Sequence, residues 1–190
     1  ATLTVNEASG VIANDDDNAS YDSESLAVTS ISSNGTSNSG NAAAAVTGTY
    51  GVLTMAADGS YQYVANTAAA EALDASDEVT DVFTYTLKDD ADVNSSTATL
   101  TITVTGVDDD PVGVNDTGAV NEDKTLSVSA GSGVLSNDTD ADDSSSISVS
   151  AITGGTVGQA KNGTYGVLTL NANGSYSYVA NGRSEDGLAA

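Results

Sequence analysis

The side chains of this chain that could do chemistry are carboxylates, and they gather where strands are expected to end. The 190 residues include 27 Asp and Glu against 4 Lys and Arg, a formal net charge of -23. Crowded carboxylates repel one another unless a cation neutralises them, and calcium accepts about six to eight oxygen ligands in relaxed geometry. The pattern predicts calcium sites, with solvated turn aspartates as the alternative. The clusters are Asp15 to Asp17, Asp89 with Asp90 and Asp92, Asp108 to Asp110, Asp116 with Glu122 and Asp123, and Asp138 with Asp140, Asp142 and Asp143.

None of these clusters follows a standard calcium-loop motif. Asp138, Asp140 and Asp142 have the spacing that opens an EF-hand loop, but the next residue is Asp where the loop needs Gly. The twelfth position of such a loop would be Val149 rather than Glu. The glycine-rich nonapeptide of β-roll calcium repeats is absent too. The calcium prediction therefore rests on the clustering of carboxylates.

The composition excludes several classes of function. The absence of Cys and His removes disulfides, thiolate or imidazole zinc sites and the usual nucleophilic relays. The acidic surface repels nucleic acid and anionic membranes, and no apolar run reaches the roughly 20 residues of a membrane helix. Carboxylate pairs could hydrolyse glycosides, but nothing marks out one pair or supplies a cleft. We therefore expect no enzyme, no nucleic-acid partner and no membrane insertion.

An internal repeat indicates which structural elements position these carboxylates. Residues 48–66 and 163–181 are nearly the same sequence, and Gly48 recurs as Gly163, 115 positions later. A period of this length fits one small domain, so we interpret the chain as an array of one β-rich unit. Within each copy, a Gly that follows Asp58 or Asn173 can take the positive φ that closes a hairpin.

Two further segments alternate apolar and polar residues and predict a second hairpin. Residues 97–106 place Ala, Leu, Ile and Val on one face and threonines on the other. Residues 81–87 place Phe83, Tyr85 and Leu87 on one face, and turn-type residues separate the two strands. Short alternating strands with almost no helical signal indicate all-β domains built as tandem Greek-key β-sandwiches of the cadherin or immunoglobulin type. The paired Tyr61 and Tyr63 could form a sugar-binding platform, but we interpret them as core or sheet-face packing.

The domain boundary is expected near the only proline, Pro111, which follows the last strand of the first copy. We assign residues 1–109 to a first repeat that lacks its opening strand and residues 110–190 to a second repeat. The second copy contains no counterpart of residues 82–87 or 97–107. We therefore expect it to be truncated, with an incomplete sandwich and open sheet edges.

Taken in order, these motifs resemble those of a known family. The repeated Gly-Thr-Tyr-Gly-Val-Leu-Thr block, the strand pair beginning at Phe83, the junction from Asp109 to Asp116 and the segment Gly133 to Asp138 together resemble VCBS and bacterial cadherin-like repeats of large secreted, RTX-type adhesins. The resemblance implies Greek-key sandwiches strung in tandem in long extracellular surface proteins and stiffened by calcium at their junctions. It implies these calcium ligands: Asp89, Asp108, Asp109, Asp110, Asp116, Glu122, Asp123, Asp138 and Asp140.

Three hypotheses of function follow. The first is a structural, calcium-binding extender repeat that spaces and stiffens a secreted bacterial cell-surface adhesin. The second is a subunit of a self-assembling extracellular filament or surface layer, completed by strands from neighbouring subunits. The third is a carbohydrate-binding module. The expected partners are adjacent repeats of the same or neighbouring chains, with surface glycans or cell-surface components bound through other regions.

Overall fold

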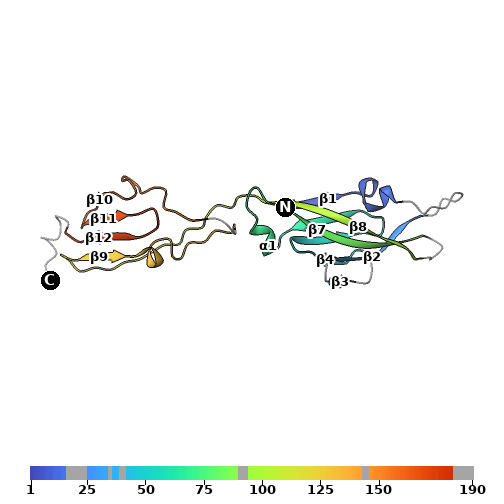
Figure 1. Ribbon diagram of the computed structural model, residues 1–190, viewed down its shortest axis with the longest axis horizontal. Coiled ribbons are helices and arrows are strands. Elements are labelled where there is room, and N and C mark those ends of the chain that lie inside the picture. Colours follow the sequence, from blue (N-terminus) through green and yellow to red (C-terminus); the bar gives the residue numbers. More distant parts are fainter. Residues whose placement is uncertain (16–24, 34–35, 39–41, 90–93, 143–145, 182–190) are drawn as a thin grey trace. The chain divides into compact units, whose positions relative to one another are not determined.

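The computed structural model describes residues 1–15, 25–33, 36–38, 42–89, 94–142 and 146–181, and it divides the chain into two compact units, Ala1–Asp108 and Asp109–Ala190 (Figure 1). The first unit contains β1 (Thr2–Val5), β2 (Ala27–Ser33), β3 (Thr36–Asn38), β4 (Ala45–Thr47), β5 (Gly51–Met55), β6 (Tyr61–Ala65), α1 (Ala68–Glu71), β7 (Glu78–Lys88) and β8 (Asn94–Thr105). The second contains β9 (Thr125–Val128), β10 (Ala160–Asn162), β11 (Val167–Leu170) and β12 (Tyr176–Val179). Single 3-10 turns lie at Glu7–Ser9, Val11–Asn14 and Ala130–Ser132.

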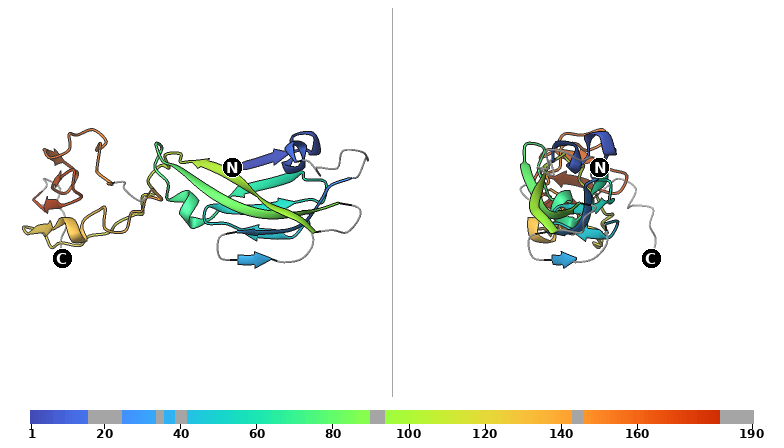
Figure 2. Two further views of the ribbon diagram at one scale, coloured as in Figure 1. Left: turned by 45° about the vertical axis from the view of Figure 1, so that its right-hand side comes forward. Right: turned by 90° about the vertical axis from the view of Figure 1, so that its right-hand side faces the viewer.

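The first unit is a β-sandwich of two antiparallel sheets, which confirms the predicted fold class. One sheet has the order β1-β6-β5-β4 and the other β3-β2-β7-β8. Figure 2 shows the long β7 and β8 strands, in green, running along this unit. The predicted hairpin of residues 48–66 is β5 and β6, and Gly59 closes it with φ of 80°. The second predicted hairpin is β7 and β8, whose strands extend beyond the predicted bounds; Asp90 and Asp92 at its tip lie outside the described residues.

The core of the first unit lies between its two sheets. Alternation turns Leu53 and Met55 of β5 inward, where both have 0% of their surface exposed. Tyr63 of β6 meets Phe83 of β7 edge-on across the interior, with ring centroids 6.1 Å apart and planes at 69°. Fully burying an aliphatic or aromatic side chain contributes about 1.5–3 kcal/mol to the free energy of unfolding. These inward residues therefore stabilise the unit because the second sheet covers them.

The described residues of the second unit form one antiparallel sheet of order β10-β11-β12-β9. Its strands repeat the first unit's β4, β5, β6 and β1 in sequence and pairing. The hairpin turn repeats as well, because Gly174 has φ of 81°. Leu168 and Leu170, which correspond to Leu53 and Met55, are only half-buried. The described residues of the second unit therefore repeat one layer of the sandwich.

The segment of the second unit that corresponds to β2 forms no strand among the described residues. Residues 147–153 match the apolar pattern of residues 26–32, and Val149 N donates to Ala172 O at 2.9 Å as Val28 N donates to Ala57 O at 2.9 Å. In the first unit β2 pairs with β7. The described part of the second unit holds no counterpart of β7, and residues 147–153 form no strand. A strand needs a neighbour to satisfy its backbone groups, so this segment stays irregular.

Candidate functional site

One carboxylate with four hydrogen-bond donors is buried in the first unit. Asp81 of β7 has only 3% of its surface exposed. Its Oδ1 accepts from Thr49 N at 2.8 Å, and its Oδ2 accepts from Tyr50 N at 3.0 Å and Gly51 N at 3.1 Å. The Tyr63 hydroxyl donates to the same Oδ2 at 2.6 Å. Four donors therefore replace the water that this carboxylate loses on burial.

The repeated Gly-Thr-Tyr-Gly motif explains how a carboxylate can sit there. A Cβ added to Gly48 would lie 2.4 Å from Asp81 Oδ2, and one added to Gly51 would lie 2.4 Å from the Tyr63 ring. The turn is closed by Gly48 N donating to Gly51 O at 2.7 Å. We call residues 48–51 together with the Tyr63 hydroxyl the first cradle. It joins the two sheets, since residues 48–51 lead into β5 whereas Asp81 comes from β7.

A second tyrosine to aspartate contact lies elsewhere in the same core. The Tyr85 hydroxyl donates to Asp15 Oδ2 at 2.9 Å, with Val11 O as a longer acceptor at 3.4 Å. Burial, and then the hydrogen bond to Asp15, raise the pKa of Tyr85 to about 12. Burial and the contact with Asp81 likewise raise the pKa of Tyr63. Both hydroxyls therefore stay protonated at neutral pH and act as fixed donors.

The second unit repeats the cradle. Gly163 N donates to Gly166 O at 2.8 Å, and a Cβ added to Gly166 would lie 2.7 Å from the hydroxyl and ring of Tyr178. We call residues 163–166 with the Tyr178 hydroxyl the second cradle. Within the described ranges, no carboxylate accepts from Tyr165 N, Gly166 N or the Tyr178 hydroxyl. Tyr165 is 57% exposed, whereas its counterpart Tyr50 packs against the core.

The acidic residues that open the second unit meet the loop around Asp140. Asp109 N donates to Asp142 Oδ2 at 3.0 Å, and Asp142 N donates to Asp140 Oδ1 at 3.1 Å. Val114 N donates to Asp138 Oδ1 at 2.7 Å, beside an antiparallel bridge of Val112 with Thr139. Asp142 is buried, with 7% of its surface exposed. Each of the three loop carboxylates thus already accepts from the backbone through one oxygen.

The predicted calcium ligands are spread over both units. Asp109, Asp138 and Asp140 are partly buried and lie in the contacts just described, and Asp89 is partly buried at the end of β7. No three Asp or Glu side chains converge into a group that could hold an ion, as far as the described residues go. The donor chemistry of Asp138 to Asp142, hard oxygens at alternate positions of one loop, nevertheless suits calcium. The remaining predicted ligands are exposed: Asp108, Asp110, Asp116, Glu122 and Asp123.

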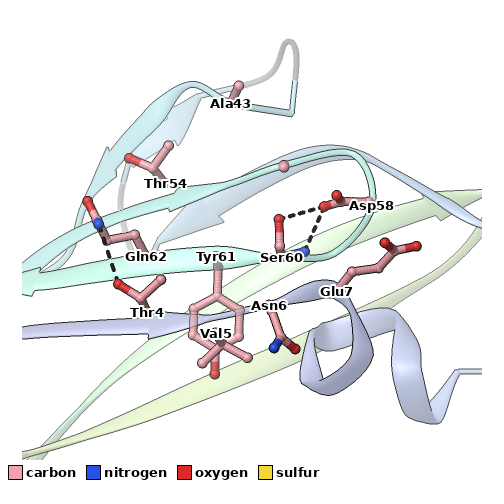
Figure 3. A pocket seen from close by; sticks show the side chains of 11 residues that line it. Thr4, Val5, Asn6, Glu7, Ala43, Thr54, Asp58, Ser60, Tyr61 and Gln62 are labelled. Carbon is pink, nitrogen blue, oxygen red and sulfur yellow. Dashed lines mark hydrogen bonds between the residues drawn. The ribbon is translucent and has the colours of Figure 1, made fainter.

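A shallow groove of about 480 Å³ lies along β1 and β6 of the first unit (Figure 3). Thr4, Gln62 and Thr54 are cross-strand partners that line it, and Gln62 Nε2 donates to Thr4 Oγ1 at 3.5 Å. Tyr61 is the one aromatic residue of the lining, and it packs partly against the core. Tyr63 is buried, as the packing interpretation of this pair expected. The groove therefore offers hydroxyl and amide groups without an open aromatic platform.

Sequence reasoning did not single out Asp81 or the Gly-Thr-Tyr-Gly cradle. A signal was present, because Asp81 stands two residues before Phe83 on the inward face of an alternating strand. An inward carboxylate needs buried donors, and the repeated glycines indicate where the backbone could come close enough to supply them. The burial of Asp142 had no comparable signal.

Comparison with known proteins identifies the repeat. The family profile of the bacterial cadherin-like domain matches residues 1–106 and again residues 108–187, and no curated protein matches the chain. Such domains are extracellular repeats that generally bind calcium and are typically non-enzymatic. Among the described residues, no helix has the length and apolar character needed to cross a membrane. With both halves matched in tandem and the first folded as the expected sandwich, this chain belongs to the bacterial cadherin-like domain family.

Proposed function

We propose that this chain is a spacer segment of a secreted bacterial cell-surface adhesin, in which tandem sandwich repeats hold a distal binding region away from the cell. The observation that carries the proposal is the occurrence of the same cadherin-like unit twice in succession. The strongest buried polar contacts of the first unit, at Asp81 and Tyr85, join parts of its own core. Such contacts stabilise the unit as a building block and leave the chemistry of adhesion to other regions.

Calcium is the stiffening agent in this proposal. The chain carries a net charge of -23, and backbone hydrogen bonds hold the loop of Asp138, Asp140 and Asp142 beside residues 109–114, where the second unit begins. Asp138, Asp140 and Asp142 would supply carboxylate oxygens, and Asp109 and Asp110 would add charge from the adjoining segment. When bound, the ion neutralises carboxylates that otherwise repel one another. Asp138 and Asp142 tie this loop to residues 109–114, so they would order the entry segment of the second unit.

The test is metal analysis of the purified full chain, with thermal melting in calcium, in magnesium and in chelator. We expect bound calcium, a melting temperature that rises in calcium, and a smaller shift in magnesium, which demands stricter octahedral geometry. The Asp140→Asn variant should lose most of the calcium shift, whereas Glu71→Gln on α1 should keep it. No bound calcium and no shift would overturn the stiffening mechanism.

A second candidate function is assembly by strand addition between chains. It is favoured by the single sheet that the described residues of the second unit form and by the half-buried state of Leu168 and Leu170. Such a sheet face gains stability when another polypeptide covers it. Sedimentation of the full chain over a range of concentrations tests self-assembly directly. Concentration-dependent growth supports it, and a single species at 18.8 kDa under all conditions contradicts it.

A further inference from the structure

The groove of the first unit opens on the outer face of its β1-β6-β5-β4 sheet (Figure 3). Thr4 pairs with Gln62 and Gln62 pairs with Thr54, so these three exposed side chains form one row across neighbouring strands. The residues that alternate with them, such as Leu53 and Tyr63, point into the core. Neighbouring strands lie about 4.8 Å apart, so the row presents hydroxyl and amide groups over about 10 Å. Hydroxyl and amide groups both donate and accept hydrogen bonds, as a ligand with many hydroxyls requires.

Two carboxylates stand beside this row. Glu7 and Asp58 line the groove at the same end, and both also line an adjoining hollow of about 580 Å³ (Figure 3). Both side chains are exposed to water. Ser60 donates to Asp58 Oδ1 from its backbone N at 2.9 Å and from its hydroxyl at 2.6 Å, which fixes that carboxylate at the turn. Two carboxylates supply few of the about six to eight oxygens that calcium takes, whereas an ammonium group has only three N–H donors to satisfy.

The lining disfavours three other classes of ligand. Among the described residues it contains no Lys or Arg, and the chain carries a net charge of -23, so acidic sugars are repelled. Its aromatic residue, Tyr61, packs partly against the core and offers no open ring on which a neutral sugar could stack. An added peptide strand needs an open sheet edge, but the strands of Gln62 and Thr54 are already paired with each other. A sugar that carries a free amino group uses both the row and the carboxylates.

We propose that this groove binds an amino sugar, namely a glucosamine-type unit whose amino group is not acetylated, within a longer oligosaccharide. The ammonium group donates to Glu7 and Asp58, and the neighbouring sugar hydroxyls exchange hydrogen bonds with Thr4, Gln62 and Thr54. Hydrogen bonds between charged groups are stronger than neutral ones, so the amino group decides which sugars are held. The first unit then holds polysaccharide as well as spacing the chain, which goes beyond the proposed spacer function.

The second unit offers a matched comparison. Its corresponding row consists of Ser127, Ser177 and Thr169, which pair in the same order and also carry hydroxyls. At the positions of the two carboxylates it has Ala130 and Asn173. Because the row recurs without the carboxylates, we expect amino-sugar binding in the first unit alone.

The segment that enters the second unit runs on the other side of its sheet. A Cβ on Gly118 would lie 3.0 Å from Leu126 and 3.0 Å from the Tyr176 hydroxyl. Both side chains belong to the inward face, since they alternate along their strands with Ser127 and Ser177 of the row. A segment in the corresponding position of the first unit would therefore leave the groove uncovered.

The test is a titration of the full chain with two tetramers, one of glucosamine and one of N-acetylglucosamine. Binding is followed by NMR at about pH 6, where the amine is protonated and the carboxylates are ionised. We expect the glucosamine tetramer to bind at least about tenfold more tightly than the acetylated one. Its binding should shift the amide signals of Glu7, Ser60 and Gln62 and leave those of Ser127 and Ser177 in place.

Removal of single charges distinguishes a site from general attraction to an acidic chain. Asp58→Asn should lower the affinity for the glucosamine tetramer about tenfold. This variant should keep the turn, because Asn173 of the second unit accepts from Ser175 N at 3.1 Å and from Ser175 Oγ at 2.7 Å. Glu7→Gln should have a similar effect. Glu71→Gln removes the same charge from α1 and should leave the affinity unchanged.

Three results would overturn the inference. Equal affinity for the two tetramers would show that the amino group is not recognised. Equal losses of affinity in Asp58→Asn and Glu71→Gln would show attraction to the net charge alone. A lysine tetrapeptide that binds as tightly, with the same shifts, would show that the groove accepts any ammonium group and that sugar hydroxyls contribute nothing. None of these results affects the calcium melting test, so the spacer function is tested independently.

Discussion

The two units carry nearly the same 19-residue block and differ in what covers it. In the first unit, Leu53 and Met55 are fully buried under the sheet that contains β7 and β8. In the second, Leu168 and Leu170 lie in an equivalent hairpin with the same turn and register but remain half-buried. The block thus specifies its hairpin and cradle locally. Its contribution to stability depends on a second layer that comes from distant residues.

The largest effect is expected from removal of Asp81. The Asp81→Ala variant leaves three backbone donors and the Tyr63 hydroxyl without an acceptor in the core, so the first unit should lose about 3–5 kcal/mol of unfolding free energy. Urea unfolding of the full chain, followed by hydrogen exchange in each unit, measures this loss. Glu78→Ala, at an exposed position of the same strand, is the control and should change little.

If Asp81→Ala prevents folding of the first unit, Asp81→Asn keeps the comparison measurable, because its amide oxygen still accepts from part of the cradle. An Asp81→Ala loss no larger than that of Glu78→Ala would contradict the role of the cradle.

The next comparison concerns matched leucines. Leu53→Ala should destabilise the first unit by about 2–5 kcal/mol, since it opens a cavity in a core that has no exposed surface at that position. Leu168→Ala should change the stability of the second unit less, by about 1 kcal/mol, because the side chain is only partly buried among the described residues. Unfolding monitored in each unit by hydrogen exchange checks both values, and equal losses would show that a second layer covers both units.

A smaller difference is expected between matched tyrosines. Tyr63→Phe removes one hydrogen bond to a buried carboxylate and should lower the stability of the first unit by about 1.5–3 kcal/mol. Tyr178→Phe removes a hydroxyl without a carboxylate partner among the described residues, so we expect less than about 0.5 kcal/mol in the second unit. Denaturant unfolding of the two variants measures the contrast, which a comparable loss at Tyr178 would refute.

The smallest of these effects concerns Tyr85 and its dependence on pH. At neutral pH, Tyr85→Phe should lower the stability of the first unit by about 1 kcal/mol. The pKa of Tyr85 is about 12 in the folded unit, above the ordinary value of 10.0 that applies on unfolding. Its contribution is therefore complete below pH 10 and declines between pH 10 and pH 12, because the unfolded chain loses the proton first.

Alkaline unfolding curves of wild-type chain and Tyr85→Phe measure this dependence. The variant should lose less stability across that pH range. Parallel curves for the two proteins would show that the contact with Asp15 contributes nothing to the pH dependence.

The sequence predicted the layers of this fold better than its polar contacts. Alternation and the repeated glycines gave the β5–β6 and β7–β8 hairpins, because inward and outward residues differ in kind along each strand. The alternation of apolar and polar residues could not show which aspartate would be buried and hydrogen-bonded. Asp81 is set apart by its position among buried donors of a distant turn, and Asp142 by a loop that folds back on residues 109–114. These are tertiary contacts that spacing along the chain does not encode.

The most direct test of this account is amide hydrogen exchange of the unmodified full chain, resolved at the two cradles. Tyr50 and Gly51 donate to Asp81, whereas Tyr165 and Gly166 have no carboxylate acceptor in the described part of the second unit. We predict slow exchange at Tyr50 and Gly51, at the level of the core strands, and exchange at Tyr165 and Gly166 that is faster by orders of magnitude. Equal protection at these two pairs of amides would contradict the claim that Asp81 protects Tyr50 and Gly51 whereas no described carboxylate protects Tyr165 and Gly166.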